Sequence, residues 1–185
     1  NMPTKLLLSL TLLAGSFSHA KPNLIFIMAD DLGYGDLGCF GQKLIKTPRL
    51  DQLAREGTLF TSFYTQTVCG PSRSALLTGR YPCRSKGWGM PASEITFGEL
   101  MRKAGYQTAC IGKWDVSNRK AIIDRMPNAQ GFDYYYGTLG ANDGGGVRFH
   151  ENNKASGSSR DMGELTTLYT DKSIEYLKKK RDPKK

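Results

Sequence analysis

Long apolar runs and cysteines are both scarce in this sequence. A membrane-spanning helix needs about 20 consecutive apolar residues, and no run in the 185 residues reaches that length. The four Cys are too few for a small scaffold held together by disulfide bonds. With 39% hydrophobic residues, the composition is that of one ordinary globular domain whose core comes from apolar burial.

Residues 1–20 have the three parts of a secretory signal peptide. Lys5 gives a short basic region, residues 6–14 are mainly apolar, and Ser18-His19-Ala20 is a small-x-small cleavage site. We therefore expect export to the periplasm or secretion, with residues 21–185 forming part of one domain. No Cys follows Ala20 to carry a lipid, so we expect no membrane anchor.

The formal net charge of +9 is concentrated at the C-terminus. Only one acidic residue, Asp182, stands among the basic residues there, which are Lys178, Lys179, Lys180, Arg181, Lys184 and Lys185. A terminal run of this kind is typical of a solvated helix end. We therefore expect no nucleic-acid partner.

Short apolar runs alternate with helix signals along the first part of the chain. Residues 23–29 contain an unbroken apolar run, which predicts a strand buried on both faces of a parallel sheet. Thr47 and Pro48 can start a helix that Gly57 ends. The buried face of that helix would carry Leu50, Leu53 and Ala54. Residues 58–64 predict a second strand.

The middle of the chain repeats this order. Residues 72–77 predict a helix that Thr78-Gly79 closes. Thr96 and Glu99 form a capping box at the start of another helix, which Gly105 ends. Residues 106–111 predict a short buried strand. Strands that alternate with helices predict an α/β fold with a mostly parallel central sheet flanked by helices.

The last part of the chain predicts a loop and then a helix. Residues 137–163 are rich in Gly, Asn and Ser, which is typical of a long surface loop near the rim of an active site. Residues 164–180 should form one amphipathic helix, because apolar side chains recur at helical spacing at Leu165, Leu168, Tyr169, Tyr176 and Leu177. A further strand is due after it, so we expect a truncated, N-terminal part of a catalytic domain.

Two adjacent carboxylates are a candidate metal site. Asp30 and Asp31 directly follow the first predicted strand, at the end of the sheet where ligands bind in open α/β folds. A turn at Leu32-Gly33 could bring both carboxylates round one hard cation such as Ca²⁺. The alternative is that the two residues only form a turn.

Cys69 is a candidate reactive residue. It precedes a predicted helix and lies four positions before Arg73, in Cys69-Gly70-Pro71-Ser72-Arg73. The helix dipole and the guanidinium both favour the charged form of such a thiol. The alternative is a buried structural Cys.

These segments resemble the formylglycine-dependent type I sulfatases of the alkaline-phosphatase-like superfamily. Their signature, C-x-P-S-R followed by L-T-G-R, occurs here at residues 69–73 and 77–80. Five further blocks follow the family's order: N-L-I-F-I-M-A-D-D-L-G-Y-G-D-L-G, T-P-R-L-D-Q-L-A-R-E-G, G-R-Y-P, L-M-R-K-A-G-Y-Q-T-A and G-F-D-Y-Y-Y-G. So many blocks in register over residues 22–185 are more specific than one motif.

The resemblance implies a nucleophile and a metal. Cys69 would be oxidised to formylglycine during export by a formylglycine-generating or anaerobic sulfatase-maturating enzyme. Asp30, Asp31 and the modified Cys69 would bind Ca²⁺, because a hydrated aldehyde is an oxygen ligand suited to a hard ion. One hydroxyl would attack the ester sulfur, and the other would expel sulfate as the aldehyde re-forms.

The resemblance also implies roles for two cations and contains one departure. Arg73 would hold the formylglycine and offset its negative charge, and Lys113 would bind a sulfate oxygen. Many members have a substrate-contacting His where this chain has Asp115. An ionised carboxylate cannot donate a hydrogen bond and repels a sulfate ester. Asp115 could orient Lys113 or Arg119, turn away, or bind a substrate that offers a donor; we favour the first.

The remaining Cys and His residues give weaker signals. Cys39, Cys83 and Cys110 can form at most one disulfide, for which Cys39 and Cys83 are one possible pair. Cys110 lies in an apolar strand and is expected to be a packed thiol. His150 lies in the polar segment and is expected to be exposed.

The function expected from the resemblance is hydrolysis of a sulfate ester, on a carbohydrate. The alternatives are a phosphodiester or phosphonate monoester hydrolase of the same superfamily, and a binding protein that keeps the fold without chemistry. The intact Cys69, Arg73, Asp30, Asp31 and Lys113 argue against the last. This chain alone is expected to be inactive, because the family places further metal and substrate ligands downstream.

Overall fold

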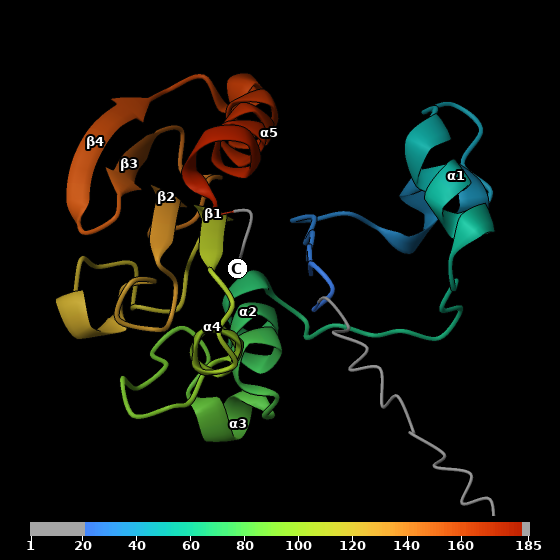
Figure 1. Cartoon of the computed structure of the whole chain (residues 1–185). Helices are drawn as coiled ribbons and strands as arrows, with labels where there is room; N and C mark the ends of the chain where they lie inside the picture. Colours follow the sequence, from blue (N-terminus) through green and yellow to red (C-terminus); the bar gives the residue numbers. More distant parts are fainter. Residues whose placement is uncertain (1–20, 183–185) are drawn as a thin grey trace, which may run out of the picture. The chain divides into compact units, whose positions relative to one another are not determined.

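The structure is a computed structural model that describes residues 21–182, and its chain divides into two compact units (Figure 1). The first unit ends at Asp30 and the second begins at Asp31. The predicted signal peptide, residues 1–20, lies outside the described residues. In the described part of the chain, no helix has the length and apolar character needed to cross a membrane.

The apolar run in the first unit does not form the predicted buried strand. Residues 21–30 have no helix or strand, and Leu24, Ile25, Phe26 and Ile27 are each at least 59% exposed. A strand requires backbone partners in a neighbouring strand, and the described sheet is formed by other segments. The prediction of a strand at residues 23–29 is therefore wrong for this structure.

The second unit opens with 3₁₀ turns η1 (Tyr34–Asp36) and η2 (Gly38–Phe40) and helix α1 (Pro48–Glu56). Helix α1 has the predicted bounds, with Pro48 as its first residue and Gly57 as its C-cap. Thr47 connects α1 to η2, because its Oγ1 accepts from the Gly38 N–H at 2.8 Å and donates to Asp51 Oδ1 at 2.9 Å. Two predictions here are wrong: the leucines of α1 are exposed, and residues 58–64 form no strand.

Three helices follow, and their ends agree with the local sequence signals. They are α2 (Cys69–Thr78), α3 (Pro82–Ser85) and α4 (Phe97–Lys103). The predicted capping box is present, because Thr96 Oγ1 accepts from the Glu99 N–H while a Glu99 oxygen accepts from the Thr96 N–H. Gly79, with φ of 63°, closes α2 as predicted. Helix α2 begins three residues earlier than predicted, at Cys69.

The sheet has the order β1 (Ala109–Lys113), β2 (Tyr134–Thr138), β3 (Val147–Glu151) and β4 (Lys154–Ser159). Strands β1 and β2 are parallel, whereas β2, β3 and β4 pair antiparallel. The α/β class is confirmed, but the expectation of a mostly parallel sheet is wrong for the described strands. The predicted loop at residues 137–163 is also wrong, because alternating burial places β3 in the sheet and Asn152, with φ of 52°, turns the chain into β4.

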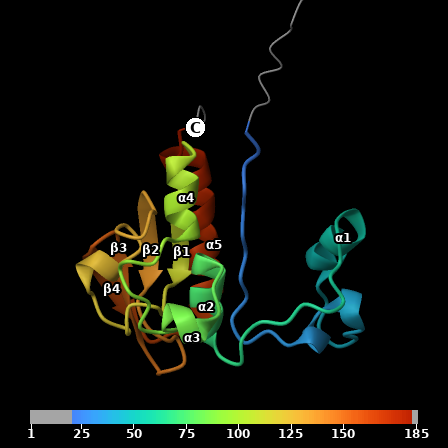
Figure 2. The same ribbon diagram turned by 90° about the horizontal axis from the view of Figure 1, so that it is seen from below.

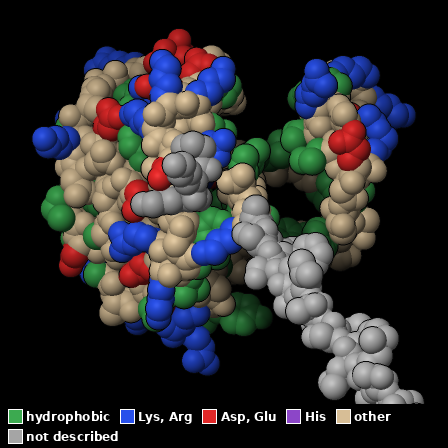
Figure 3. Space-filling model, viewed as in Figure 1, with side chains coloured by type: hydrophobic (Ala, Val, Ile, Leu, Met, Phe, Trp, Pro, Cys, Tyr) green, Lys and Arg blue, Asp and Glu red, His purple; other side chains and the backbone are tan. Residues whose placement is uncertain are grey.

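Helix α5 (Leu165–Glu175) and the π-helical turn η5 (Tyr176–Lys180) confirm the predicted C-terminal helix. Helix α5 packs beside β1 and β2 (Figures 1 and 2). The cluster between helix and sheet consists of Tyr134, Tyr136, Val147, Phe149, Leu165 and Tyr176. Lys180 donates to Glu151 at 2.8 Å and lowers the pKa of that carboxyl. The terminal basic run is therefore not purely solvated, and Figure 3 shows acidic and basic side chains interspersed over this unit.

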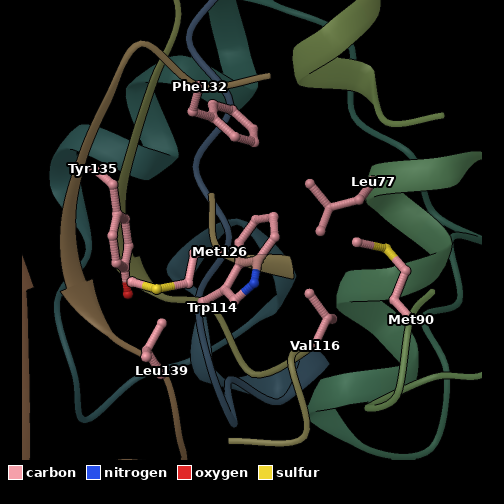
Figure 4. Close-up of a cluster of buried hydrophobic side chains, with 8 residues drawn as sticks. All are labelled: Leu77, Met90, Trp114, Val116, Met126, Phe132, Tyr135 and Leu139. Carbon is pink, nitrogen blue, oxygen red and sulfur yellow. The ribbon is translucent and has the colours of Figure 1, made fainter. Parts of the chain in front are cut away.

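A second cluster fills the other side of the sheet and borders the site described below. It contains Leu77, Met90, Trp114, Val116, Met126, Phe132, Tyr135 and Leu139 (Figure 4). Trp114 lies at its centre, edge-on to Phe132 with ring centroids 6.0 Å apart, and its Nε1 donates to the Arg125 carbonyl at 2.9 Å. Cys110 packs against this cluster, and burial raises its pKa to about 12, which confirms the predicted packed thiol.

The pairing of β1 and β2 depends on a close approach of two glycines. Gly112 faces Gly137 in the parallel register, and a Cβ on Gly137 would overlap the Gly112 carbonyl oxygen. In the full-length protein, we expect Gly137→Ala to lower the free energy of unfolding by about 1–3 kcal/mol, because backbone must move. Urea unfolding would measure this. Gly144→Ala, which meets nothing within 4 Å, is the control; equal stability of the two variants would contradict the prediction.

Candidate functional site

Cys69 is the first residue of α2, and the loop before it is held by the helix itself. Ser72 Oγ donates to the Val68 carbonyl at 2.9 Å and accepts from the Gln66 N–H at 3.1 Å. Val68 is extended and serves as the N-cap. Ser72, the Ser of the C-x-P-S-R motif, therefore fixes the backbone just before Cys69. The thiol lies at the positive end of a helix dipole.

The carboxyl end of β1 meets α2 at this point. Arg73 Nη1 donates to the Lys113 carbonyl oxygen at 2.6 Å, across forty positions of sequence. Beyond the strand, the Trp114 N–H donates to the Thr138 carbonyl at 2.8 Å, which keeps the chain beside β2. The structure thus brings together four predicted site residues: Cys69, Arg73, Lys113 and Asp115.

Asp115 is the centre of this group. Its side chain is fully buried, and its neighbours Trp114 and Val116 both point into the core cluster of Figure 4. Oδ2 accepts from Cys69 Sγ at 3.1 Å and from Trp88 Nε1 at 3.2 Å. Oδ1 accepts from Arg119 Nε at 3.0 Å. Lys113 Nζ lies 3.8 Å from Oδ2, close enough for an ion pair.

These contacts favour one of the three accounts of Asp115. A buried carboxylate must be paired or hydrogen-bonded, and the chain's own donors reach both of its oxygens. The side chain is not turned away from the group, and it has no exposed surface for a substrate donor. The geometry therefore supports the first account, in which Asp115 orients Arg119 and attracts Lys113.

Sequence reasoning missed Trp88 and Gly70. The indole of Trp88 lies against Gly70, so closely that a Cβ there would overlap the ring. The variable position of C-x-P-S-R is thus restricted to Gly in this chain, because the ring must pass to reach Asp115. A Trp between two glycines, Gly87 and Gly89, was the available signal, but it does not indicate the partner.

The two predicted metal ligands fall on either side of the boundary between the two units of the chain. Asp30 is the last residue of the first unit, and Asp31, with a φ of 55°, is the first residue of the second. Within residues 21–182, no three or more His, Cys, Asp or Glu side chains gather as a metal site. The calcium site stays a prediction that rests on the chemistry of its donors.

The other cysteines and the histidine have structural surroundings. Cys39 and Cys83 are both free thiols, so the possible disulfide between them is not formed. His150 is half-buried in β3 rather than exposed, and burial lowers its pKa. The expectation of an exposed His150 is therefore wrong, because its segment is a strand of the sheet.

Comparison with known proteins identifies the family. The family model described as Sulfatase matches residues 22–185. The chain belongs to the sulfatase family. Human steryl-sulfatase is 42% identical over 143 residues, which cover 67% of this chain and 24% of that protein. Human arylsulfatase A is 43% identical over 156 residues, which cover 77% of this chain and 30% of that protein.

A solved structure has the same fold as this chain. The crystal structure of Ps i-CgsB in complex with k-i-k-neocarrahexaose matches with a TM-score of 0.76 and 30% identity. The match covers 87% of this chain and 42% of that one. This sulfatase chain therefore has the alkaline-phosphatase-like fold expected from its sequence. It spans roughly a quarter to three tenths of the length of the curated relatives above.

Trp88 should stabilise the buried carboxylate through one hydrogen bond. In the full-length protein, we expect Trp88→Phe to lower the free energy of unfolding by about 1–3 kcal/mol, since a buried charge loses a donor. A double-mutant cycle with Asp115→Asn separates this bond from the loss of ring volume. Calorimetry should give a coupling energy above zero, and strictly additive effects would contradict the contact.

Proposed function

We propose that the full-length protein hydrolyses a sulfate ester, with a formylglycine made from Cys69 as its nucleophile and a calcium ion as its cofactor. The observation that carries the proposal is the convergence of Cys69, Arg73 and Lys113 at one end of β1 in a chain of the sulfatase family. The proposal gives each of these residues a task that its position allows.

The two cations suit an anionic ester. Lys113 and Arg73 are linked through the Lys113 carbonyl, so the helix that carries Cys69 and the strand that carries Lys113 cannot move independently. Two cations that are already in place at the end of β1 before the ester binds attract its sulfate group and stabilise the negative charge that develops on it. Their fixed positions mean that no reorganisation is needed when the ester binds.

Asp115 is placed to accept a hydrogen bond, and then the proton, from residue 69. Its Oδ2 already accepts from Cys69 Sγ at 3.1 Å, and an oxygen in place of the sulfur would offer an O–H donor to the same atom. A formylglycine hydrate would supply the nucleophilic oxygen and a second hydroxyl for release of sulfate. Asp115 Oδ2 would orient one of these hydroxyls and hold its proton.

The donor set of Asp30 and Asp31 fits calcium in type. Carboxylate oxygens are among the ligands that Ca²⁺ prefers, and the ion takes six to eight oxygen ligands in all. Two residues supply only part of that shell, and residue 69 would add to it once it carries oxygen. The remaining ligands would be carbonyl groups, water or side chains of the longer protein.

A carbohydrate is the substrate class that we propose. The neighbour Ps i-CgsB was solved with a bound neocarrahexaose, an oligosaccharide. An exported sulfatase would meet sulfated carbohydrates outside the cytoplasm, and the N-terminal segment of this chain predicts export. The maturation enzyme that oxidises Cys69 is the protein partner that the proposal requires.

The proposal is tested by the chemical state of residue 69. In full-length protein exported by a host with the maturation enzyme, we expect mass spectrometry to find an aldehyde in the tryptic peptide that carries residue 69. Hydrazide should trap it, and the protein should cleave an aryl sulfate faster than an aryl phosphodiester. Unmodified Cys69 alone would overturn the mechanism, and preference for the phosphodiester would overturn the substrate class.

The metal assignment is tested by one carboxylate. We expect Asp31→Asn in the full-length protein to lose activity by more than the roughly 10- to 100-fold that loss of an outer metal partner costs, and to bind less calcium by isothermal titration. Its fold should persist, because Asn tolerates the positive φ at that position. Asp143→Asn, an exposed carboxylate on a loop, is the matched control. Equal calcium binding by both variants would refute the assignment.

A further inference from the structure

Arg119 donates to the carboxylate of Asp115, as the proposed nucleophile Cys69 does, but has no task in the reaction described above. Its side chain is 51% exposed, although Asp115, to which its Nε donates, is fully buried. The stem runs alongside Gly140, where an added Cβ would meet its Cβ, Cγ and Cδ at 3.5–3.9 Å. Among the described residues, this guanidinium forms a single hydrogen bond, the one from Nε. Its two NH₂ groups therefore keep their donors for another ligand.

The same carboxylate connects Arg119 to residue 69. One oxygen of Asp115 accepts from Arg119 and the other from Cys69. The Asp115 carboxylate thus connects the Arg119 guanidinium with residue 69, which would attack the ester. We therefore expect the substituents next to an ester bound at residue 69 to lie near Arg119.

The backbone holds Arg119 in a conformation that its residue type disfavours. Asp115, Asn118 and Arg119 all have positive φ, of 57°, 53° and 57°. The segment is fixed by the Asn118 N–H, which donates to the Trp88 carbonyl at 2.8 Å. Local strain that the surroundings maintain in this way is characteristic of functional segments.

We propose that Arg119 is a specificity-determining residue, whose NH₂ groups bind a second oxyanion of the substrate next to the scissile sulfate. The oxyanion is a carboxylate or another sulfate, since the planar guanidinium matches both with paired hydrogen bonds. This inference rests on the proposed sulfatase function and narrows its substrate class to carbohydrates that carry at least two negative charges.

The test uses the formylglycine-containing full-length protein and three sulfated disaccharides. One is neutral apart from the scissile ester, one also has a uronate carboxylate, and one has a second sulfate; a rise in kcat/KM for only one of the last two identifies the oxyanion. We expect Arg119→Gln to reduce the preference for that substrate over the neutral one by about 10- to 100-fold, the size of one or two charge-assisted hydrogen bonds. Arg119→Lys keeps the positive charge but loses the planar pair of NH₂ groups. Its preference should therefore lie between those of the wild type and Arg119→Gln.

The ratio of kcat/KM values separates recognition from a general loss of activity or folding. Lys120→Gln removes the same charge from the adjacent exposed residue and should leave the ratio unchanged. An equal ratio in wild type and Arg119→Gln, with the neutral ester still cleaved, would overturn the role of Arg119 while the sulfatase proposal stands. Failure of the wild-type protein to cleave any sulfate ester would overturn the proposed function itself.

Discussion

The site depends on the hydrogen bonds that the buried carboxylate of Asp115 accepts. A charge without exposed surface is tolerated only when donors surround it, and here they come from three separate parts of the chain. Cys69 begins helix α2, Trp88 follows helix α3, and Arg119 lies beyond strand β1. Loss of any one donor would leave a desolvated charge less well compensated, so the three parts are held to a common geometry.

This requirement explains features that are otherwise unrelated. The left-handed backbone at Asp115 lets its carboxylate face away from the direction of Trp114 and Val116, which remain in the core. Gly70 must lack a side chain because Trp88 crosses it on the way to Asp115. The hydrogen bond from Arg73 to the Lys113 carbonyl joins helix α2 to strand β1. Each contact links residues far apart in sequence.

Features set by neighbouring residues were predictable, and those set by distant partners were not. The capping box of Thr96 and Glu99, the Gly79 C-cap and the Pro48 start depend on residues a few positions apart, and all are present. The apolar run at residues 23–29 lacks the hydrogen-bonded neighbours that a strand needs, which no periodicity can supply. The hairpin of β3 and β4 was masked by its Gly, Asn and Ser content, although Val147 and Phe149 alternate with Arg148.

The departure at Asp115 was the most informative part of the sequence, because a replaced residue changes what its neighbours can do. A neutral His could accept one hydrogen bond and donate one, so it could not hold an arginine by charge. An aspartate at the same point attracts Arg119 on one oxygen and still accepts from residue 69 on the other. The exchange of a substrate-contacting donor for a carboxylate therefore does not simply remove a contact. Under the role proposed for Arg119, the donating function passes from residue 115 to residue 119, whose longer side chain reaches the surface.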